Sequence, residues 1–416
     1  MPFSFSFRVF KAFCCLILSV SGTVLLGQQP AVTAEYALLD SELVARVLPL
    51  AIKTEPVIVP ERRFSREWLA EQGLAFTFSY TAEAFTNVRR DPKQRRGAEY
   101  LGSVGTTFEF DFGKLGLGRG QLVVSAQSLH GRSINDSRVG AFQAPSNLDN
   151  AAFNKFTEVW YGDSYLDKRI RIKIGQQYAD ADFNVTENAS EFLNSSYGLI
   201  PTILSPTYPT AMLGASVWAE PAKWIAIGAG VYRGGELEPI DETARPMKQG
   251  LFTMAEVKLN PHSSNSAFHG AYSVGVWQQA KGAWSTLTGT GAVRNGGVYA
   301  TLDQWFRRAN SAGENSGPGL FLQAGWAPAD RNEITAYIGG GLAWRGLLPM
   351  RSNDSVGLGV TQVKLSATGR ETATEVFYRW QVSKRLAVQP DIQFVNRPNG
   401  TGRNAVVTGI RTVFEI

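Results

Sequence analysis

The chain has 416 residues, of which 44% are hydrophobic and 19% are charged, and its formal net charge is +5. The charged fraction lies below the roughly 25% of typical soluble domains, and so small a net charge does not suggest the concentrated basic face of a nucleic-acid-binding protein. Three histidines and two cysteines leave little material for a zinc site or a disulfide framework. Composition therefore disfavours a metalloenzyme, a disulfide scaffold and a nucleic-acid binder, and we expect no cofactor.

Residues 1–34 have the pattern of a signal peptide. Arg8 and Lys11 form a short basic region, an apolar run follows, and Val32-Thr33-Ala34 places small residues where a signal peptidase cuts. The apolar run has about 15 residues, fewer than the roughly 20 of a spanning helix, which favours a cleaved peptide over a retained anchor. Cleavage would remove both cysteines, so the mature chain would have no disulfide.

Residues 35–73 are predicted to form a short periplasmic helix and a linker. Leucines and valines recur at roughly helical spacing from Leu38 to Leu48. Pro56 and Pro60 then interrupt the pattern.

From residue 74 to residue 416 the hydrophobic period changes to two. In Arg169–Gly175 charged and apolar residues alternate, so Ile170, Ile172 and Ile174 would share one face of a strand and the charged residues the other. Similar runs recur to the end of the chain. The sixteen predicted strands are 74–85, 99–112, 120–131, 155–166, 169–179, 211–221, 224–234, 250–260, 269–279, 296–307, 317–327, 331–345, 354–366, 372–382, 386–396 and 404–416.

The length of these runs favours a membrane barrel. Strands of soluble proteins average about 5 to 6 residues, whereas a tilted membrane-spanning strand needs about 9 to 11. An even number of long alternating strands predicts an all-β fold, a transmembrane antiparallel β-barrel of about 16 strands. Closure pairs every backbone amide and carbonyl within the sheet, which removes the need for disulfides. Glycines within the strands would allow bending and leave space in the lumen.

Aromatic residues near the ends of the runs suggest the interfacial girdles of such barrels. The residues assigned to girdles are Tyr80, Trp160, Tyr161, Trp218, Trp224, Tyr232, Trp277, Trp305, Trp326, Trp344 and Trp380.

The connections mostly alternate between tight turns and long loops. Tight periplasmic turns are predicted at 167–168, 222–223 and 383–385, and long outer loops at 86–98, 132–154 and 180–210. Residues 328–330 are too short for an outer loop and 346–353 are long for a turn, so either a strand is misplaced there or that loop is trimmed. Residues 180–210 would be the third outer loop, which in sixteen-stranded porins folds into the barrel and narrows it.

Several stretches resemble the carbohydrate-selective porin family of OprB type. They include Phe156–Tyr161, Arg171–Gln176 with Asp182-Phe183, Phe192–Gly198, Gln389–Val395 and Asn404–Arg411, in the order of the family. The resemblance implies a sixteen-stranded channel for sugars across the Gram-negative outer membrane, acting as a monomer or a trimer. The chain departs from the usual pattern by ending in Ile416 where outer-membrane proteins usually end in Phe.

A sugar pore needs polar side chains that replace water around hydroxyls and aromatic faces that stack on the ring. The alternation predicts such a lining from the barrel, with Ile392 and Phe394 facing lipid and further candidates in the third loop. The predicted constriction and binding residues are Glu158, Trp160, Arg171, Lys173, Asp180, Asp182, Asn194, Tyr197, Arg379, Asp391 and Gln393, accompanied in the lumen by Arg169, Glu375 and Gln389. Opposed acidic and basic clusters would set a transverse field.

Other functions stay open. The basic run of residues 89–96 could bind lipopolysaccharide phosphates or collect anionic solutes, or it could be a solvated loop. A general or anion-preferring porin is one alternative. An outer-membrane Ser/His hydrolase is another, using His130, His262 or His269, although no nucleophile-elbow motif appears. A secreted sugar-binding β-protein is the third.

Overall fold

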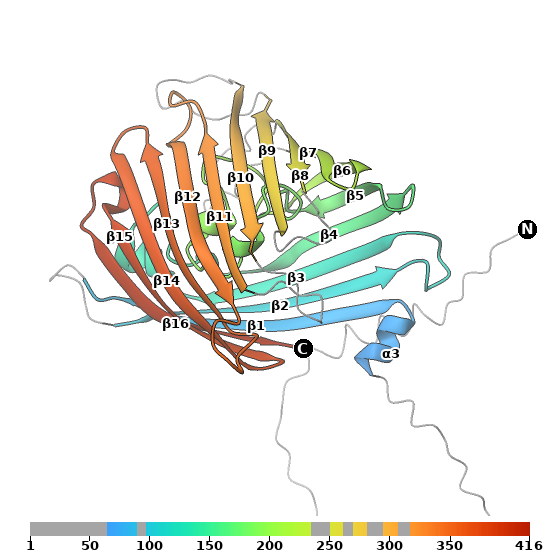
Figure 1. Ribbon diagram of the computed structural model, residues 1–416, viewed down its shortest axis with the longest axis horizontal. Coiled ribbons are helices and arrows are strands. Elements are labelled where there is room, and N and C mark those ends of the chain that lie inside the picture. The colour runs from blue at the N-terminus through green and yellow to red at the C-terminus, as the bar shows by residue number, and fades with distance from the viewer. Residues whose placement is uncertain (1–64, 90–96, 234–249, 261–268, 281–293, 307–316) are drawn as a thin grey trace, which may run out of the picture. The chain divides into compact units, whose positions relative to one another are not determined.

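The computed structural model describes residues 65–89, 97–233, 250–260, 269–280, 294–306 and 317–416 (Figure 1). The predicted signal peptide and the predicted helix before Pro56 lie outside these residues. The segment predicted as linker contains helix α3 (Arg66–Glu71), which begins at Ser65, whose hydroxyl accepts a hydrogen bond from the Trp68 amide at 3.1 Å. Within the described residues, no helix combines the length and the hydrophobicity of a transmembrane helix.

The described residues form sixteen antiparallel strands that close into one barrel, in which each strand pairs with its sequence neighbours and β1 pairs with β16. This confirms the predicted fold. The strands are β1 (Leu74–Asn87), β2 (Glu99–Asp111), β3 (Gln121–Gly131), β4 (Phe153–Tyr165), β5 (Ile170–Gln177), β6 (Met212–Ala222), β7 (Ile225–Arg233), β8 (Leu251–Leu259), β9 (His269–Gln279), β10 (Asn295–Trp305), β11 (Gly317–Trp326), β12 (Ile334–Arg345), β13 (Ser355–Leu365), β14 (Gly369–Ser383), β15 (Leu386–Asn396) and β16 (Ala405–Glu415).

No strand was misplaced around residues 328–330 and 346–353, where the predicted connections had unusual lengths. β11, β12 and β13 pair in sequence, so 327–333 is a short loop and 346–354 a long turn. We call the barrel end with the connections 166–169 and 223–224 the short-turn end. The opposite end is the long-loop end. Outer-membrane barrels keep their short turns in the periplasm, so the long-loop end faces outward.

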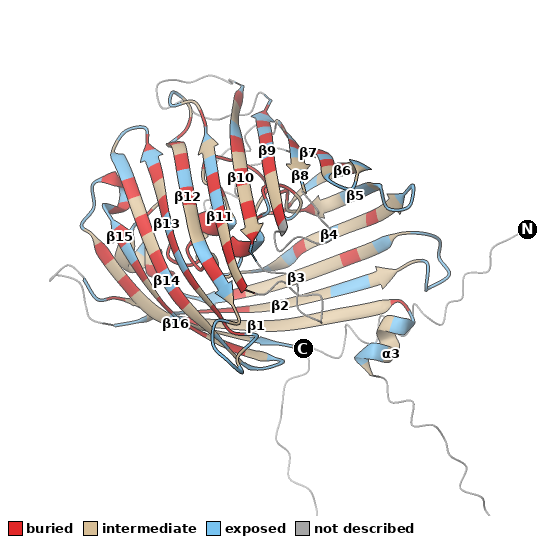
Figure 2. Cartoon of the chain, in the orientation of Figure 1, coloured by how far each residue is buried: buried red, intermediate tan, exposed pale blue. Residues whose placement is uncertain are grey.

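Side chains alternate between an apolar outer face and an inner face along the strands, and Figure 2 shows the resulting bands of buried and exposed residues on strands such as β10, β12 and β13. On β15, Asp391 and Gln393 are buried on the inner face, whereas the Phe394 side chain is 43% exposed on the outer face. On β5, Ile172 and Ile174 are exposed on the outside. In a membrane these exposed apolar side chains contact lipid, which is why the isolated chain shows so many of them.

Two loops from the long-loop end fill part of the lumen. We call residues 132–152 loop 2 and residues 178–211 loop 3. Loop 3 contains the short helices η2 (Glu187–Ala189) and α4 (Ser195–Gly198), and it packs against the wall through Phe192, whose ring lies 5.3 Å from Phe321 and 4.9 Å from Phe377. The inward folding of loop 3 was predicted; that of loop 2, which contains helix η1 (Asn135–Val139), was not.

Glycines on the inner wall make room for loop 3. A Cβ atom on Gly357 would lie 2.8 Å from the Phe192 ring, and one on Gly359 would lie 2.7 Å from the Tyr197 hydroxyl. These strand glycines therefore serve close packing of a loop against the sheet, in line with the predicted lumen space.

The assignment of all aromatic residues to lipid-facing girdles was wrong for about half of them. The outer face carries Tyr80, Tyr161, Trp224, Trp326, Trp344 and Trp380, but the inner face carries Trp160, Trp218, Tyr232, Trp277 and Trp305. A period of two shows that residues share a face without showing which face is outward. Here the inserted loops provide an apolar environment within the lumen, so large aromatic side chains are buried there.

Candidate functional site

A polar cavity of about 540 Å³ lies against the inner wall of β3 to β6 at the short-turn end. We call the five side chains that dominate it the tryptophan–lysine cluster: Trp160 from β4, Arg171 and Lys173 from β5, Asp182 from loop 3 and Trp218 from β6. Four of the five were predicted as site residues from the alternation of β4 and β5 and from loop 3. The register explains their meeting, because Arg171 pairs directly with Trp218 and both point inward.

Lys173 is the centre of this cluster. Its ammonium lies 4.4 Å from the centre of the Trp160 ring, 3.6 Å from a carboxylate oxygen of Asp182 and 3.9 Å from one of Glu158. The side chain is only 13% exposed, so these contacts hold it in place. Glu158 is a further predicted residue that the structure brings to this cluster.

Arg171 is the accessible cation of the cluster. Its side chain is 55% exposed, and its guanidinium lies 3.5 Å from Glu220. Arg169, predicted to share its face, instead lies just before β5 in the turn 166–169, where its amide donates to the Leu166 carbonyl.

Trp218 was missed as a site residue because we had assigned it to a girdle. Its ring packs on Phe183 of loop 3 at 5.1 Å, and the Lys258 ammonium of β8 lies 5.0 Å from its centre. Lys258 is in turn 3.5 Å from Glu256. The signal was present in the sequence, since Ser216, Trp218 and Glu220 alternate with apolar residues along β6.

The arrangement suits an uncharged polar solute with an apolar face. Indole rings can stack on the C–H face of a sugar ring, while the charged groups beside them accept and donate hydrogen bonds to hydroxyls. Two cations of the wall have nearby carboxylates: Lys173 lies near Glu158 and Asp182, and Arg171 lies near Glu220. These ion pairs place both signs of charge on the same wall, whereas the sequence predicted opposed basic and acidic clusters.

Arg379 lies in a second charged group on the far side of the ring of strands. Its guanidinium is 3.8 Å from Glu191 of loop 3, and Arg345 of β12 is 3.3 Å from the same carboxylate. The Ser355 hydroxyl of β13 also donates to Glu191. β13 is eight strands from β5 in the barrel order, so the two groups belong to opposite walls.

Four of the predicted residues are buried where loop 3 meets the wall. Asn194 donates from its side chain to the Gln143 carbonyl and to Gln393, each at 3.1 Å, and Gln393 donates to Asp391 at 3.0 Å. Tyr197 is fully buried with its ring 4.4 Å from that of Phe192. These side chains hold the loop in place and do not line the cavity.

Asp180 also stabilises the conformation of loop 3. The Thr207 hydroxyl donates to its carboxylate across the base of loop 3. Burial raises the pKa of Asp180 to about 6, while the hydrogen bond from Thr207 opposes that rise.

The inserted loops are held by carboxylates of the wall that accept backbone amide hydrogens. Glu375 of β14 accepts from Leu193 at 2.6 Å and from Asn194 at 2.8 Å. Four other wall carboxylates make the same kind of contact to the loops. They are Glu371 with Phe142 and Gln143, Asp303 with Glu187 and Asn188, Glu256 with Asn184, and Glu158 with Tyr178.

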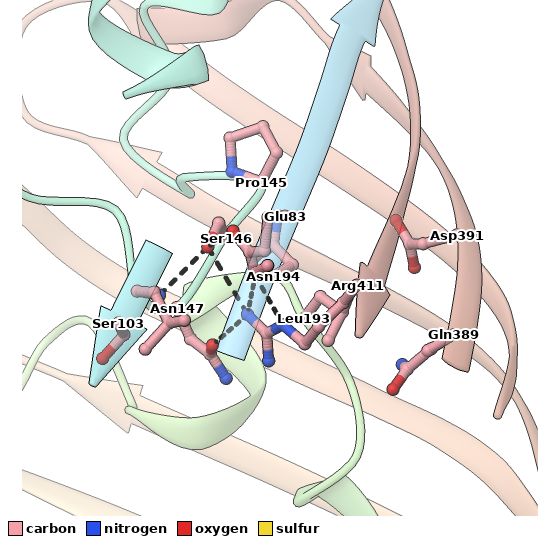
Figure 3. A network of polar contacts seen from close by, with 12 residues as sticks. Glu83, Ser103, Pro145, Ser146, Asn147, Leu193, Asn194, Gln389, Asp391 and Arg411 are labelled. Atoms are coloured by element: carbon pink, nitrogen blue, oxygen red, sulfur yellow. Dashed lines mark hydrogen bonds and ion pairs between the residues drawn. The ribbon is translucent and has the colours of Figure 1, made fainter. Parts of the chain in front are cut away.

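Loop 2 has its own anchor at the junction of the first and last strands (Figure 3). Arg411 of β16 forms an ion pair with Glu83 of β1 and donates to Asn147 at 2.7 Å. The Ser146 hydroxyl donates to Glu83 at 2.7 Å. No sequence pattern in either strand marks these partners, because the contacts join residues from 63 to 328 positions apart.

A closed barrel with an apolar outer face, a polar cavity in its lumen and a loop folded inward defines an outer-membrane porin. The chain belongs to the carbohydrate-selective porin family of OprB type, because the sequence profile of that family matches residues 95–416. It is therefore a porin of the outer membrane that admits carbohydrates, as the sequence predicted.

Individual relatives agree with this assignment. Porin B of Pseudomonas aeruginosa is 21% identical over 409 residues, which cover 84% of this chain and 89% of that protein. The high-pH structure of Pseudomonas putida OprB superimposes with a TM-score of 0.72 at 17% identity, over 84% of this chain and 96% of that one. Its low-pH structure gives a TM-score of 0.56 at 17% identity, over 84% and 95% of the two chains. These likenesses in structure show the shared fold.

Proposed function

We propose that neutral monosaccharides and small oligosaccharides cross the barrel by contacting the tryptophan–lysine cluster. The observation that carries this proposal is the inward indole of Trp160, which lines one polar cavity together with charged side chains. Trp218 lines the same cavity but is only 5% exposed, with Phe183 and Lys258 against its ring. A sugar moving past Trp160 would exchange water for hydroxyl contacts and stack its apolar face on an indole. The cluster thus favours sugars over solutes that lack such a face.

The pairing of charges supports neutral solutes over ions. Because Lys173 has two carboxylates within 4 Å, an anion near it would also meet their repulsion. One observation favours the second candidate, an anion-preferring pore: Arg171 is largely exposed, and Lys168 lines the same cavity. The reversal potential in a salt gradient separates the two, since a sugar channel with paired charges should show weak ion preference.

The first prediction concerns the two indoles. We expect Trp160→Leu to weaken the block of ion current by glucose about two- to tenfold, because ring stacking contributes about 0.5 to 1.5 kcal/mol. Trp218→Leu should weaken it less, because the Trp218 ring is only 5% exposed. The measurement is glucose titration of the protein in planar bilayers. Trp326→Leu on the outer face, where the side chain is 54% exposed, is the matched control. Equal sugar block in all three variants and the wild type would contradict the role of the cluster.

We infer a channel without enzymatic activity, which turnover in a lipid-hydrolase assay on the purified protein would contradict. A homo-oligomer and contact with lipopolysaccharide stay predictions, testable by cross-linking in outer-membrane fractions. Most of the basic run 89–96 lies outside the described residues.

A further inference from the structure

The two longest turns that the structure describes in full at the short-turn end combine exposed apolar side chains with cations. They are residues 112–120, between β2 and β3, and residues 346–354, between β12 and β13. Figure 2 shows the first of them as exposed over most of its length. Their exposed large apolar side chains are Leu115, Leu117, Leu347, Leu348 and Met350. Apolar groups gathered on a turn in this way indicate a surface that covers them.

In each of these turns an arginine lies over an aromatic ring of the outer face. The Arg119 guanidinium is 4.7 Å from the centre of the Tyr165 ring, and the Arg351 guanidinium is 5.4 Å from the centre of the Trp380 ring. Tyr165 shares the lipid-facing side of the sheet with Ile170, its partner on β5, and both rings are exposed. The two arginines therefore lie on the outside of the barrel at its rim, where the headgroups of a bilayer begin, and not in the lumen.

Carboxylates hold both arginines from the protein side. Asp354 is almost buried and accepts hydrogen bonds from two nitrogens of Arg351, at 2.8 and 3.1 Å. Asp163 lies 3.7 Å from Nη2 of Arg119, which also donates to the Ser164 carbonyl at 2.5 Å. The Arg119 side chain is still 65% exposed, so its remaining N–H donors can reach an acceptor outside the protein.

The short-turn rim as a whole is cationic. The five connections at this end that the structure describes in full carry eight cations and only two carboxylates, of which Asp354 is already bonded to Arg351. The cations are Lys114, Arg119, Lys168, Arg169, Lys223, Arg351, Lys384 and Arg385. Lys168 lines the lumen cavity, but the others leave an excess of positive charge around the rim, which attracts anionic lipid.

We propose that the turns 112–120 and 346–354 bind the phosphate groups of anionic phospholipids in the periplasmic leaflet of the outer membrane. Arg119 and Arg351 contact the phosphates, because a guanidinium offers a planar pair of donors to two phosphate oxygens. The neighbouring leucines and Met350 enter the upper part of the acyl chains, as apolar residues of interfacial segments do. Lipid is favoured over a soluble acidic partner because the rings beneath the arginines face the bilayer. The proposal does not depend on which solute crosses the barrel.

The test titrates the purified protein in detergent with phosphatidylglycerol or phosphatidylcholine and counts the bound lipids by native mass spectrometry. We expect phosphatidylglycerol to bind at least about twentyfold more tightly, since each cation near an anionic lipid surface raises the affinity about fivefold. Arg119→Gln combined with Arg351→Gln should lose most of this preference. Equal binding of the two lipids by the wild type, or an unchanged preference in the double variant, would overturn the proposal.

A matched double variant removes two arginines from the long-loop end. Arg132→Gln combined with Arg331→Gln changes side chains that are 75% and 28% exposed, close to the 65% and 37% of Arg119 and Arg351, and it should keep the full preference. Arg119→Lys should restore much of what Arg119→Gln loses. Heat-modified migration in gel electrophoresis shows that each variant forms a folded barrel.

Two further measurements separate the lipid from other anions. Leu115→Ser combined with Leu117→Ser should weaken both lipids by a similar factor and leave the preference unchanged; loss of the preference there would refute the role of the arginines. Glycerol 3-phosphate should compete with phosphatidylglycerol only at far higher concentration, and equal competition would indicate a site for free anions. Sedimentation with peptidoglycan that the wild type shows and the Arg119/Arg351 variant lacks, without any lipid preference, would assign the rim to the cell wall and overturn the proposal.

Discussion

Two aspartates of the inserted loops are acids that the fold shields from water. Burial raises the pKa of Asp149 in loop 2 and of Asp180 in loop 3 to about 6, from 3.8 for the free side chain. Between pH 3.8 and pH 6, each carboxyl is therefore protonated more often when its loop is seated in the lumen than when the loop is exposed to water. Each carboxyl favours the seated loop most when it is protonated, and that contribution is lost as pH rises through about 6.

We predict that loop 3 is seated more firmly at pH 5 than at pH 7.5 by a contribution from Asp180 of about 1.4 kcal/mol, the part of the effect of a pKa rise from 3.8 to about 6 that is still present at pH 5. The Asp180→Asn variant should lose this part of the pH dependence. At pH 7.5 its loop 3 should be cleaved more slowly by protease than loop 3 of the wild type. The measurement is the rate of limited proteolysis within loop 3 at both pH values. A steeper pH dependence in the variant than in the wild type would refute the assignment.

The inserted loops are held against the inner wall by carboxylates of the strands, which accept hydrogen bonds from the backbone amides of the loops. Glu375 receives two such bonds from loop 3, and removing it would leave both buried amides without partners at about 1 to 3 kcal/mol each. Glu375→Ala should therefore loosen loop 3, while Glu375→Gln, which keeps one acceptor oxygen, should have a smaller effect.

Single-channel recording tests this expectation. We predict larger and noisier conductance for Glu375→Ala, an intermediate trace for Glu375→Gln and no change for Glu109→Ala, a control on β2 whose side chain is exposed. Quiet, wild-type currents from Glu375→Ala would show that other contacts suffice to hold the loop.

The sequence predicted the strands well because each depends on a local pattern. The alternation in β5 and β15 requires only a few adjacent residues to specify which side chains share a face, and both strands have the predicted faces. The same locality explains why Glu158, Arg171 and Lys173 were found as neighbours, since β4 and β5 are joined by a tight turn.

The remaining features depend on contacts between distant parts of the chain. Asn194, Tyr197 and Gln393 were predicted to line the channel, but their burial follows from how loop 3 packs on strands some 200 residues later. Trp218 was assigned to lipid because alternation does not reveal whether an aromatic face meets a bilayer or an inserted loop.

At the scale of the molecule, the barrel is stable only if its outer face stays apolar. Ile338 lies near the middle of β12, and its side chain is 62% exposed on that face. We predict that Ile338→Arg lowers the free energy of unfolding in lipid by about 2 to 4 kcal/mol, whereas Ile338→Val changes it little. Unfolding by urea in bilayer vesicles measures the difference, and equal stability of the two variants would argue against lipid contact at this position.

The anchor of loop 2 has a consequence for how the protein is assembled. Glu83 belongs to the first strand and Arg411 to the last, and loop 2 contacts both. This part of its seat therefore exists only after the two ends of the sheet have met, whereas the contact of Phe142 and Gln143 with Glu371 of β14 does not depend on that closure. A chain cut short before β16 would lack both the closed seam and the Arg411 contact, so we expect it to hold loop 2 by fewer bonds even where the remaining strands pair.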